Sequence, residues 1–128
     1  MNLLLDTHIW IWAKSDASRI GKRAAQELSN RNNELWISPV SVWEAIALMQ
    51  KGRIRMANPF LWCERAAEQM REAPLTNEIV RVGLALQLPH ADPADRFLAG
   101  TAKVLNLTLV TADRKLLGLG DIASLSND

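Results

Sequence analysis

Short apolar runs recur along the chain, and segments with helical periodicity separate them. The first run, residues 3–5, is a continuous stretch of leucine of the kind that is buried on both faces of a parallel sheet. Similar runs at residues 35–37 and 107–110 predict two more strands, and residues 73–75 predict a short one. The predicted strands are therefore spread over the whole chain rather than grouped at one end.

Helix signals lie between these runs. Ser38 and Pro39 form an N-cap and first-turn pair, and the helix that they open ends at Gly52. Asn-Pro and Asp-Pro pairs at residues 58–59 and 92–93 repeat this start signal. The predicted helices cover residues 20–29, 40–51, 58–72, 76–88, 92–105 and 111–118, with a turn region at 15–19 and no element assigned to 7–14.

Strands that alternate with helices favour a central parallel or mixed sheet covered by helices on both faces, which is an α/β fold. The chain has 128 residues and contains no stretch rich in Gly, Ser or Pro that could act as a linker. We therefore expect a single domain over residues 1–128.

Composition narrows the function classes. Fifteen Lys and Arg against fourteen Asp and Glu give a formal net charge of +1, so no global field attracts nucleic acid or an anionic membrane. One cysteine, Cys63, excludes an intramolecular disulfide and a thiolate metal cluster, and its helical setting favours a packing role. The N-terminus lacks signal-peptide features and no apolar run approaches the roughly 20 residues that span a bilayer, so we expect a soluble, cytoplasmic protein.

Four acidic residues, Asp6, Glu44, Asp95 and Asp113, each follow an apolar run or lie in the opening turns of a helix after one. A parallel α/β sheet delivers such positions to one crevice at the carboxyl ends of its strands. Asp6 is the clearest case, because it directly follows the first strand. We therefore expect the four carboxylates to converge and to need a cation.

Glu44 is the only charged residue in the almost entirely apolar segment 40–50, where an ionised carboxylate would need a partner, a proton or a metal. A capping box with Ser41 is the alternative, since the two have the Ser-x-x-Glu spacing. Pro39 argues against that alternative, because it indicates that the helix has already begun at Ser38.

Each of the other acids also has a structural alternative. Asp92 has the position of an N-cap, and Asp95 in the first turn is favoured by the helix dipole, although it also lies on the stripe that faces the core. Asp113 could equally be a first-turn charge after Thr111. The hydroxyls of Thr7 and Thr111 flank acids, where they could orient a carboxylate, bind a metal-bound water or only cap the chain. Capping is favoured for Thr7.

Oxygen donors without a nearby cysteine or a paired histidine favour Mg²⁺ or Mn²⁺ over Zn²⁺. His8 and His90 do not share a metal-ligand spacing. His8 could contact the site through its closeness to Asp6, but packing or hydrogen bonding is favoured for it. Hard cations can activate water and neutralise the charge that develops on a phosphodiester, which points to a phosphoryl substrate. Two candidate phosphate-binding cations, Arg96 and Arg114, lie beside acids in the sequence. Three more come at the end of the predicted helix at 40–51 or after it: Lys51, Arg53 and Arg55. A solvated surface role is the alternative for each of the five.

Four segments together resemble a known family. They are Leu-Leu-Leu-Asp-Thr-His at 3–8, Ser-Val-Trp-Glu at 41–44, Asp-Pro-Ala-Asp-Arg-Phe-Leu-Ala at 92–99 and Leu-Val-Thr-Ala-Asp at 109–113. In order and spacing they are similar to the motifs of the PIN-domain ribonucleases, particularly the small VapC-type toxins of bacterial toxin-antitoxin modules. The resemblance spans essentially the whole chain.

The resemblance implies a three-layer α/β/α PIN-like fold with a mainly parallel sheet. It implies a Mg²⁺- or Mn²⁺-dependent endoribonuclease that forms a homodimer and is neutralised by a small antitoxin inserting a segment at the active site. The residues that match the family's metal-binding and catalytic acids are Asp6, Glu44, Asp95 and Asp113. Thr111 matches a frequent Ser or Thr beside the last acid, and Asp92 is an accessory residue or only a cap.

Three other readings compete with a nuclease. A phosphatase of the aspartyl-nucleophile type needs a second Asp two residues after the first, where this chain has His8. A receiver-like signalling domain, with Asp6 or Asp113 as phosphoacceptor, needs paired acids next to each other after the first strand and does not explain Glu44. A non-catalytic module whose acids bind metal structurally, or bind a protein partner, stays open.

Overall fold

The computed structural model describes residues 1–88 and 92–128, and its centre is one five-stranded sheet. The strand order is β3-β2-β1-β4-β5, and every neighbouring pair is parallel. The strands are β1 (Asn2–Leu5), β2 (Glu34–Ile37), β3 (Arg71–Glu72), β4 (Thr108–Thr111) and β5 (Ser124–Ser126). Because all strands are parallel, their carboxyl ends lie along a single edge of the sheet.

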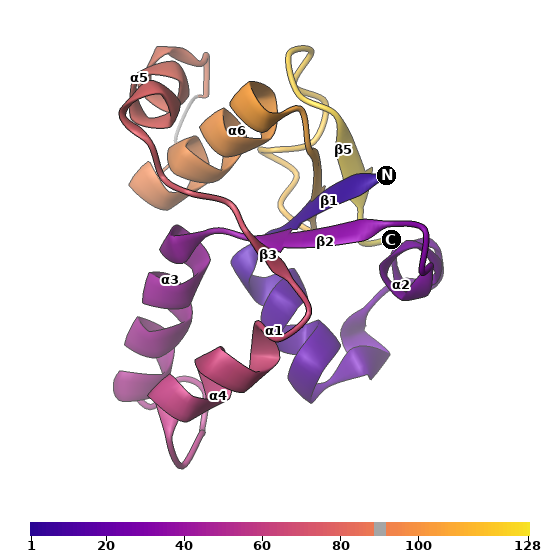
Figure 1. The fold of residues 1–128 in the computed structure, drawn as a ribbon, viewed down its shortest axis with the longest axis vertical. Coiled ribbons are helices and arrows are strands. Elements are labelled where there is room, and N and C mark those ends of the chain that lie inside the picture. Colours follow the sequence, from indigo (N-terminus) through magenta and orange to yellow (C-terminus); the bar gives the residue numbers. More distant parts are fainter. Residues whose placement is uncertain (89–91) are drawn as a thin grey trace.

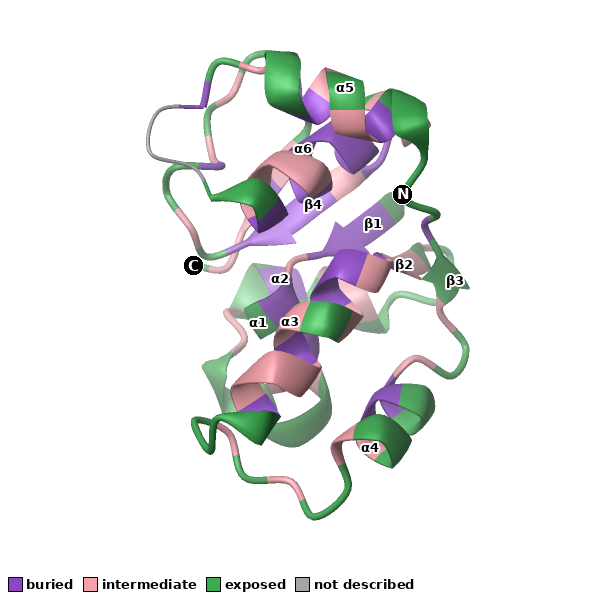
Figure 2. Ribbon diagram, turned by 90° about the vertical axis from the view of Figure 1, so that its left-hand side faces the viewer, coloured by how far each residue is buried: buried purple, intermediate pink, exposed green. Residues whose placement is uncertain are grey.

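Helices cover both faces of this sheet (Figure 1). They are α1 (Thr7–Ser15), the short 3₁₀ helix η1 (Ala17–Arg19), α2 (Lys22–Ser29), α3 (Pro39–Gln50), α4 (Pro59–Ala66), α5 (Asn77–Ala85) and α6 (Pro93–Leu105). In the side view of Figure 2, α5 and α6 lie on one side of the sheet, and α1, α3 and α4 lie on the other. The predicted α/β architecture with helices on both faces is confirmed.

The alternation of side chains along β1 divides the core in two. Leu3 and Leu5 pack with α1, α3 and α4, whereas Leu4 packs with α6 on the opposite face. In β4, Leu109 and Val110 divide between the two cores in the same way. Consecutive positions in these strands, such as residues 3–5 and 109–110, are apolar because both faces of the sheet are covered, which is why an apolar run marked each strand.

Four segments differ from the predicted elements. Helix α1 was missed, although its apolar residues are buried on the sheet. The helix predicted over residues 58–72 ends at Ala66, and a left-handed Gln69 (φ 67°) turns the chain into β3, two residues earlier than the predicted strand. In the segment 111–118, where a helix was predicted, Thr111 ends β4 and residues 114–118 form turns; β5 follows.

Helices α5 and α6 approach closely at two glycines. A Cβ on Gly83 would lie 2.4 Å from the carbonyl oxygen of Arg96, and one on Gly100 would lie 2.6 Å from that of Ile79. Only residues without a side chain fit such a contact, so α5 is held at a fixed place on α6. The helix predicted for 76–88 ends at Ala85, and Pro89 and His90 lie outside the described residues.

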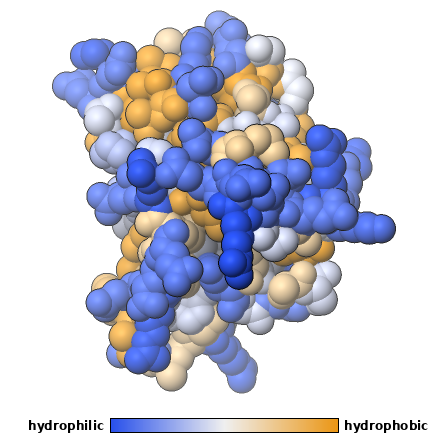
Figure 3. All heavy atoms as spheres, turned by 45° about the vertical axis from the view of Figure 1, so that its right-hand side comes forward, coloured by the Kyte–Doolittle hydropathy of each residue, from blue (hydrophilic) through white to orange (hydrophobic). Residues whose placement is uncertain are grey.

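The surface retains some large apolar side chains among the hydrophilic ones, as the face in Figure 3 illustrates. Trp43 is 70% exposed, and so helix α3 is not wholly buried as its apolar sequence suggested. Within the described part of the chain, no helix has the length and apolar character needed to cross a membrane.

Candidate functional site

One pocket collects all four predicted acids. It has a volume of about 470 Å³ and lies at the edge where the parallel strands end. It is lined by Asp6, Thr7, His8, Trp12, Glu44, Asp92, Asp95, Ala112, Asp113 and Lys115. Acids separated by up to 107 positions in sequence thus share one cavity, which is the convergence that the sequence predicted.

Asp6 lies where β1 passes directly into α1. Its backbone N–H continues the sheet by donating to the Val110 carbonyl at 3.0 Å. Its side chain is the N-cap of α1: Oδ1 accepts from the Thr7 N–H at 2.8 Å, and Oδ2 accepts from the Thr111 hydroxyl at 2.6 Å. The first residue of α1 therefore orients one carboxylate oxygen, and the end of β4 orients the other.

Glu44 is held by a hydroxyl pair, not by a capping box. Ser38 is the N-cap of α3 and accepts from the Val40 N–H, so Ser41 is free for another role. The buried Thr7 Oγ1 lies 2.5 Å from Glu44 Oε1 and 2.9 Å from Ser41 Oγ. Because a carboxylate only accepts hydrogen bonds, the single hydroxyl proton of Thr7 serves Glu44.

Thr7 therefore does something other than the predicted capping. It comes from α1 and fixes a carboxylate on α3, which joins two elements that are far apart in sequence. Thr111 combines both roles that the sequence left open: its hydroxyl donates to Asp6 and accepts from the Asp113 N–H at 3.0 Å.

The acids on α6 begin that helix. Asp92 is the N-cap and accepts from the Asp95 N–H at 2.9 Å, as its position predicted. Asp95 is in the first turn, is half-buried, and lines the pocket. The cap thus fixes the turn that carries Asp95 toward the other acids.

Burial and mutual repulsion raise the pKa values of three acids. Burial is the main cause for each, and it raises the pKa of Asp6 against the hydrogen bonds from Thr111 and Thr7. The pKa of Glu44 is also raised by burial, with added repulsion from Asp6 and Asp92. For Asp95, burial and then repulsion from the other four acids of the pocket raise the pKa to about 6.

Carboxylates that repel one another in a pocket are stabilised by a cation. Within the described residues, no group of three acid, histidine or cysteine side chains is arranged to hold a metal ion closely. Mg²⁺ keeps several of its waters and takes one or two carboxylates directly, so a loose, all-oxygen pocket suits such a hydrated ion. The donor set therefore fits Mg²⁺ or Mn²⁺ and offers no nitrogen or sulfur ligand pair for Zn²⁺.

The cations of the site differ from those expected. Arg96 does not line the pocket: its guanidinium donates to the carbonyls of Leu86 and Leu88, both at 3.1 Å, and so closes the end of α5. Arg114 is exposed and is also outside the pocket lining, as are the exposed cations that follow α3. Lys115 lines the pocket instead, two residues after Asp113.

The only sequence signal for Lys115 was its closeness to Asp113. His8, for which packing was favoured, is exposed and lines the pocket with Trp12. Trp12 was not predicted as a site residue because helix α1 itself was missed. Only that helix brings the Trp12 side chain to the pocket.

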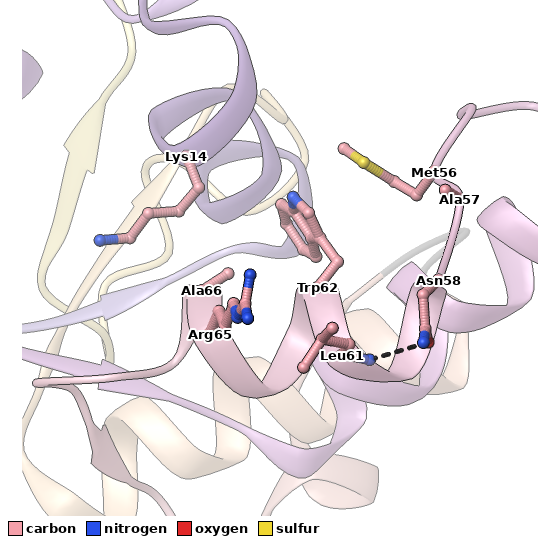
Figure 4. Close-up of a pocket in the computed structure, with 8 residues that line it drawn as sticks. All are labelled: Lys14, Met56, Ala57, Asn58, Leu61, Trp62, Arg65 and Ala66. Carbon is pink, nitrogen blue, oxygen red and sulfur yellow. Dashed lines mark hydrogen bonds between the residues drawn. The ribbon is translucent and has the colours of Figure 1, made fainter.

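A second hollow, of about 430 Å³, lies between α1 and α4 (Figure 4). Its lining consists of Lys14, Met56, Ala57, Asn58, Leu61, Trp62, Arg65 and Ala66. This lining carries two cations and no carboxylate, so it offers no anionic ligand for a hard metal ion. The chemistry of the molecule therefore points to the acidic pocket.

Comparison with known proteins gives concordant results. A family model described as PIN domain matches residues 3–121. Ribonuclease VapC22 of Mycobacterium tuberculosis is 33% identical over 116 residues, which cover 89% of this chain and 88% of that protein. The structure of VapBC2 from Rickettsia felis bound to a promoter DNA fragment matches with a TM-score of 0.79 at 18% identity, over 100% of both chains. A toxin-antitoxin complex from Klebsiella pneumoniae matches with a TM-score of 0.71 at 19% identity, over 98% of each chain.

Proposed function

The chain belongs to the PIN-domain family, as its motifs indicated, and on that premise we propose that it is a metal-dependent endoribonuclease acting as the toxin of a type II toxin-antitoxin module. The observation that carries this proposal is the convergence of four distant acids in one pocket with raised carboxyl pKa values. A fold would gain nothing from collecting such repelling charges unless they bind a cation.

In this proposal Asp6, Glu44, Asp95 and Asp113 hold Mg²⁺ or Mn²⁺. When bound, such an ion supplies the activation of water and the neutralisation of charge at the scissile phosphodiester. The chain itself supplies orientation: Thr111 fixes one oxygen of Asp6, as described above.

Thr7 plays the same part for Glu44, and Asp92 fixes the turn of Asp95. Lys115 is the pocket's own cation and is the group that we assign to a phosphate of the RNA strand. Arg96 is left out of the proposed substrate contacts, since its guanidinium is bound to backbone carbonyls.

The relatives support an antitoxin partner. The Klebsiella pneumoniae structure is described as a toxin-antitoxin complex, and several other similar structures are described as VapBC. We propose an antitoxin partner for this chain, together with a homodimeric state and a cytoplasmic location. An antitoxin segment that reaches the acidic pocket would be expected to present a cation there.

Incubation of the purified protein with a mixed cellular RNA pool tests the activity, with Mg²⁺, Mn²⁺ or EDTA in parallel. We expect discrete cuts that need the metal and that disappear in Asp6→Asn, which keeps the shape of the side chain and removes its charge. Glu64→Gln removes an exposed carboxylate outside the pocket and should cut as the native protein does. Equal cutting by Asp6→Asn and Glu64→Gln would contradict the proposed role of the acids.

The second candidate is a non-catalytic PIN-like module that binds a metal or a protein. The lack, among the described residues, of a closely arranged three-ligand cluster favours this module over a catalytic site, because catalysis needs a metal held in a fixed geometry. A folded protein that takes up Mn²⁺ through Asp6 and Glu44 but leaves every RNA intact would support this alternative.

A further inference from the structure

Two aromatic side chains form one wall of the acidic pocket. His8 and Trp12 both line it, and their ring centroids lie 5.7 Å apart with the planes inclined by 53°. They are four residues apart on α1, so they lie one above the other on the same face of the helix. His8 is exposed and Trp12 is half-buried, which leaves ring surface open at the rim of the pocket.

A cation extends this wall outward. The guanidinium carbon of Arg19 lies 5.4 Å from the centre of the Trp12 ring, within the range of a cation–π contact. Arg19 also approaches Asp16 at 3.8 Å, but both side chains are more than half exposed, so that pair contributes little. His8, Trp12 and Arg19 thus form a row, called here the aromatic row, that leads away from the acids.

Another tryptophan on the same helix shows what a purely structural role looks like. Trp10 is fully buried, donates its indole N–H to the Ala66 carbonyl at 2.9 Å, and packs against Trp62. Trp12, two residues later, instead turns toward the acidic pocket. Core packing accounts for part of Trp12 but does not account for the exposed His8 beside it.

We propose that the aromatic row is a stacking subsite for an unpaired nucleotide of the RNA strand, next to the phosphodiester that the acidic pocket addresses. This rests on the proposed function. The base stacks on the open faces of His8 and Trp12, and Arg19 contacts a phosphate farther along the strand. Aromatic and guanidinium surfaces of this kind bind unpaired bases in many RNA-binding proteins.

Electrostatics make such a subsite necessary. Five carboxylates line the pocket against one lysine, and the whole chain has a formal charge of only +1, so the protein attracts a polyanion weakly. Stacking provides affinity that does not depend on net charge. It also selects the substrate, because paired bases in a duplex are already stacked and cannot reach the row.

A fluorescent strand tests this subsite without relying on cleavage. The probe is a single-stranded oligouridylate of ten nucleotides with one central 2-aminopurine, whose fluorescence falls when the base stacks. Binding is measured in EDTA at low salt, and a gel verifies that the strand stays intact. We expect the native protein to quench the probe, and the same strand paired to its complement to bind much more weakly.

The variants are Trp12→Leu, His8→Ala and, as a matched control, Phe60→Leu. Stacking on an aromatic side chain is worth enough that removing one ring should weaken binding about tenfold and reduce the quenching. Phe60 is 63% exposed on α4, outside the acidic pocket, and its variant should bind the probe as the native protein does. His8 is exposed, so His8→Ala keeps the test valid if thermal melting shows that Trp12→Leu is unfolded.

The outcomes separate this subsite from the activity. Native affinity and quenching in both His8→Ala and folded Trp12→Leu would overturn the subsite, even if the protein cuts RNA. Failure of the native protein to bind the probe would overturn it as well, and would leave a protein partner as the occupant of the row. Quenching that depends on Trp12 in a protein that never cuts RNA would support the subsite and count against the nuclease.

Discussion

Replacing Asp95 with asparagine should stabilise the fold when no divalent metal is present. Burial and four neighbouring acids raise the pKa of this carboxyl from 3.8 to about 6. Between these two pH values the folded protein holds a proton that the unfolded chain has released. The stability from the protonated group is therefore complete below pH 3.8 and is lost as the pH rises through 6. At neutral pH the charged Asp95 opposes folding.

The size of the effect follows from the pKa shift. A shift of about two units corresponds to about 3 kcal/mol at 1.36 kcal/mol per unit, and solvent screening at this half-buried position reduces it to roughly 2 kcal/mol. Asparagine also loses a favourable interaction with the dipole of α6, worth about 0.5 kcal/mol. We expect a net gain of roughly 1.5 kcal/mol at pH 7.5, or about 5 °C in Tm.

Urea unfolding in EDTA, followed by tryptophan fluorescence at pH 7.5 and at pH 4.5, measures the difference. The electrostatic gain should fall to about a third at the lower pH, because the native carboxyl is by then mostly protonated. Glu78→Gln is the matched control, because Glu78 is also in the first turn of a helix but is exposed on α5. This variant should be slightly less stable than the native protein, because it loses only the interaction with the helix dipole. A loss in Asp95→Asn equal to that in Glu78→Gln would refute the reasoning.

Two further substitutions test contacts elsewhere. Thr7→Val removes the hydroxyl that holds Glu44, so it should lower the free energy of unfolding in urea by about 1–3 kcal/mol and weaken Mn²⁺ binding. Thr7→Ser keeps the hydroxyl and should retain native stability and native Mn²⁺ affinity. A Thr7→Val protein with native metal affinity would contradict the assigned role. Gly83→Ala places a Cβ against the backbone of α6 and should lower the free energy of unfolding by about 1–3 kcal/mol. Gly120 has open space around it, so Gly120→Ala should leave stability nearly unchanged. Equal unfolding midpoints for the two variants would count against the close packing of α5 on α6.

The sequence predicted the strands that are buried on both faces and the acids that follow them. Residues 3–5 and 107–110 were found because burial on two faces leaves a continuous apolar run. Strand β5 was missed because only Leu125 in it is buried, so neither an apolar run nor an alternation marks it. Strand β3 has two exposed residues and is defined only by its pairing with β2.

Helix α1 was missed for a different reason. Its sequence contains Ile9, Trp10, Ile11 and Trp12 in succession, which gives no polar face to mark a helical period. The helix begins because the Asp6 side chain caps it, and the sequence interpretation had assigned that side chain to chemistry alone. One carboxylate serves as both cap and pocket wall, and neither role excludes the other.

This dual use explains how the acidic pocket is compatible with a stable fold. Asp6 and Asp92 each cap a helix, and Thr111 stabilises Asp6 from the neighbouring strand, so the charges of these acids are partly offset by hydrogen bonds from the fold itself. No hydrogen bond of this kind offsets the charge of Asp95 enough to keep its pKa low. Burial and repulsion thus act on Asp95 without an opposing hydrogen bond, and this is the acid at which a bound cation should raise stability most.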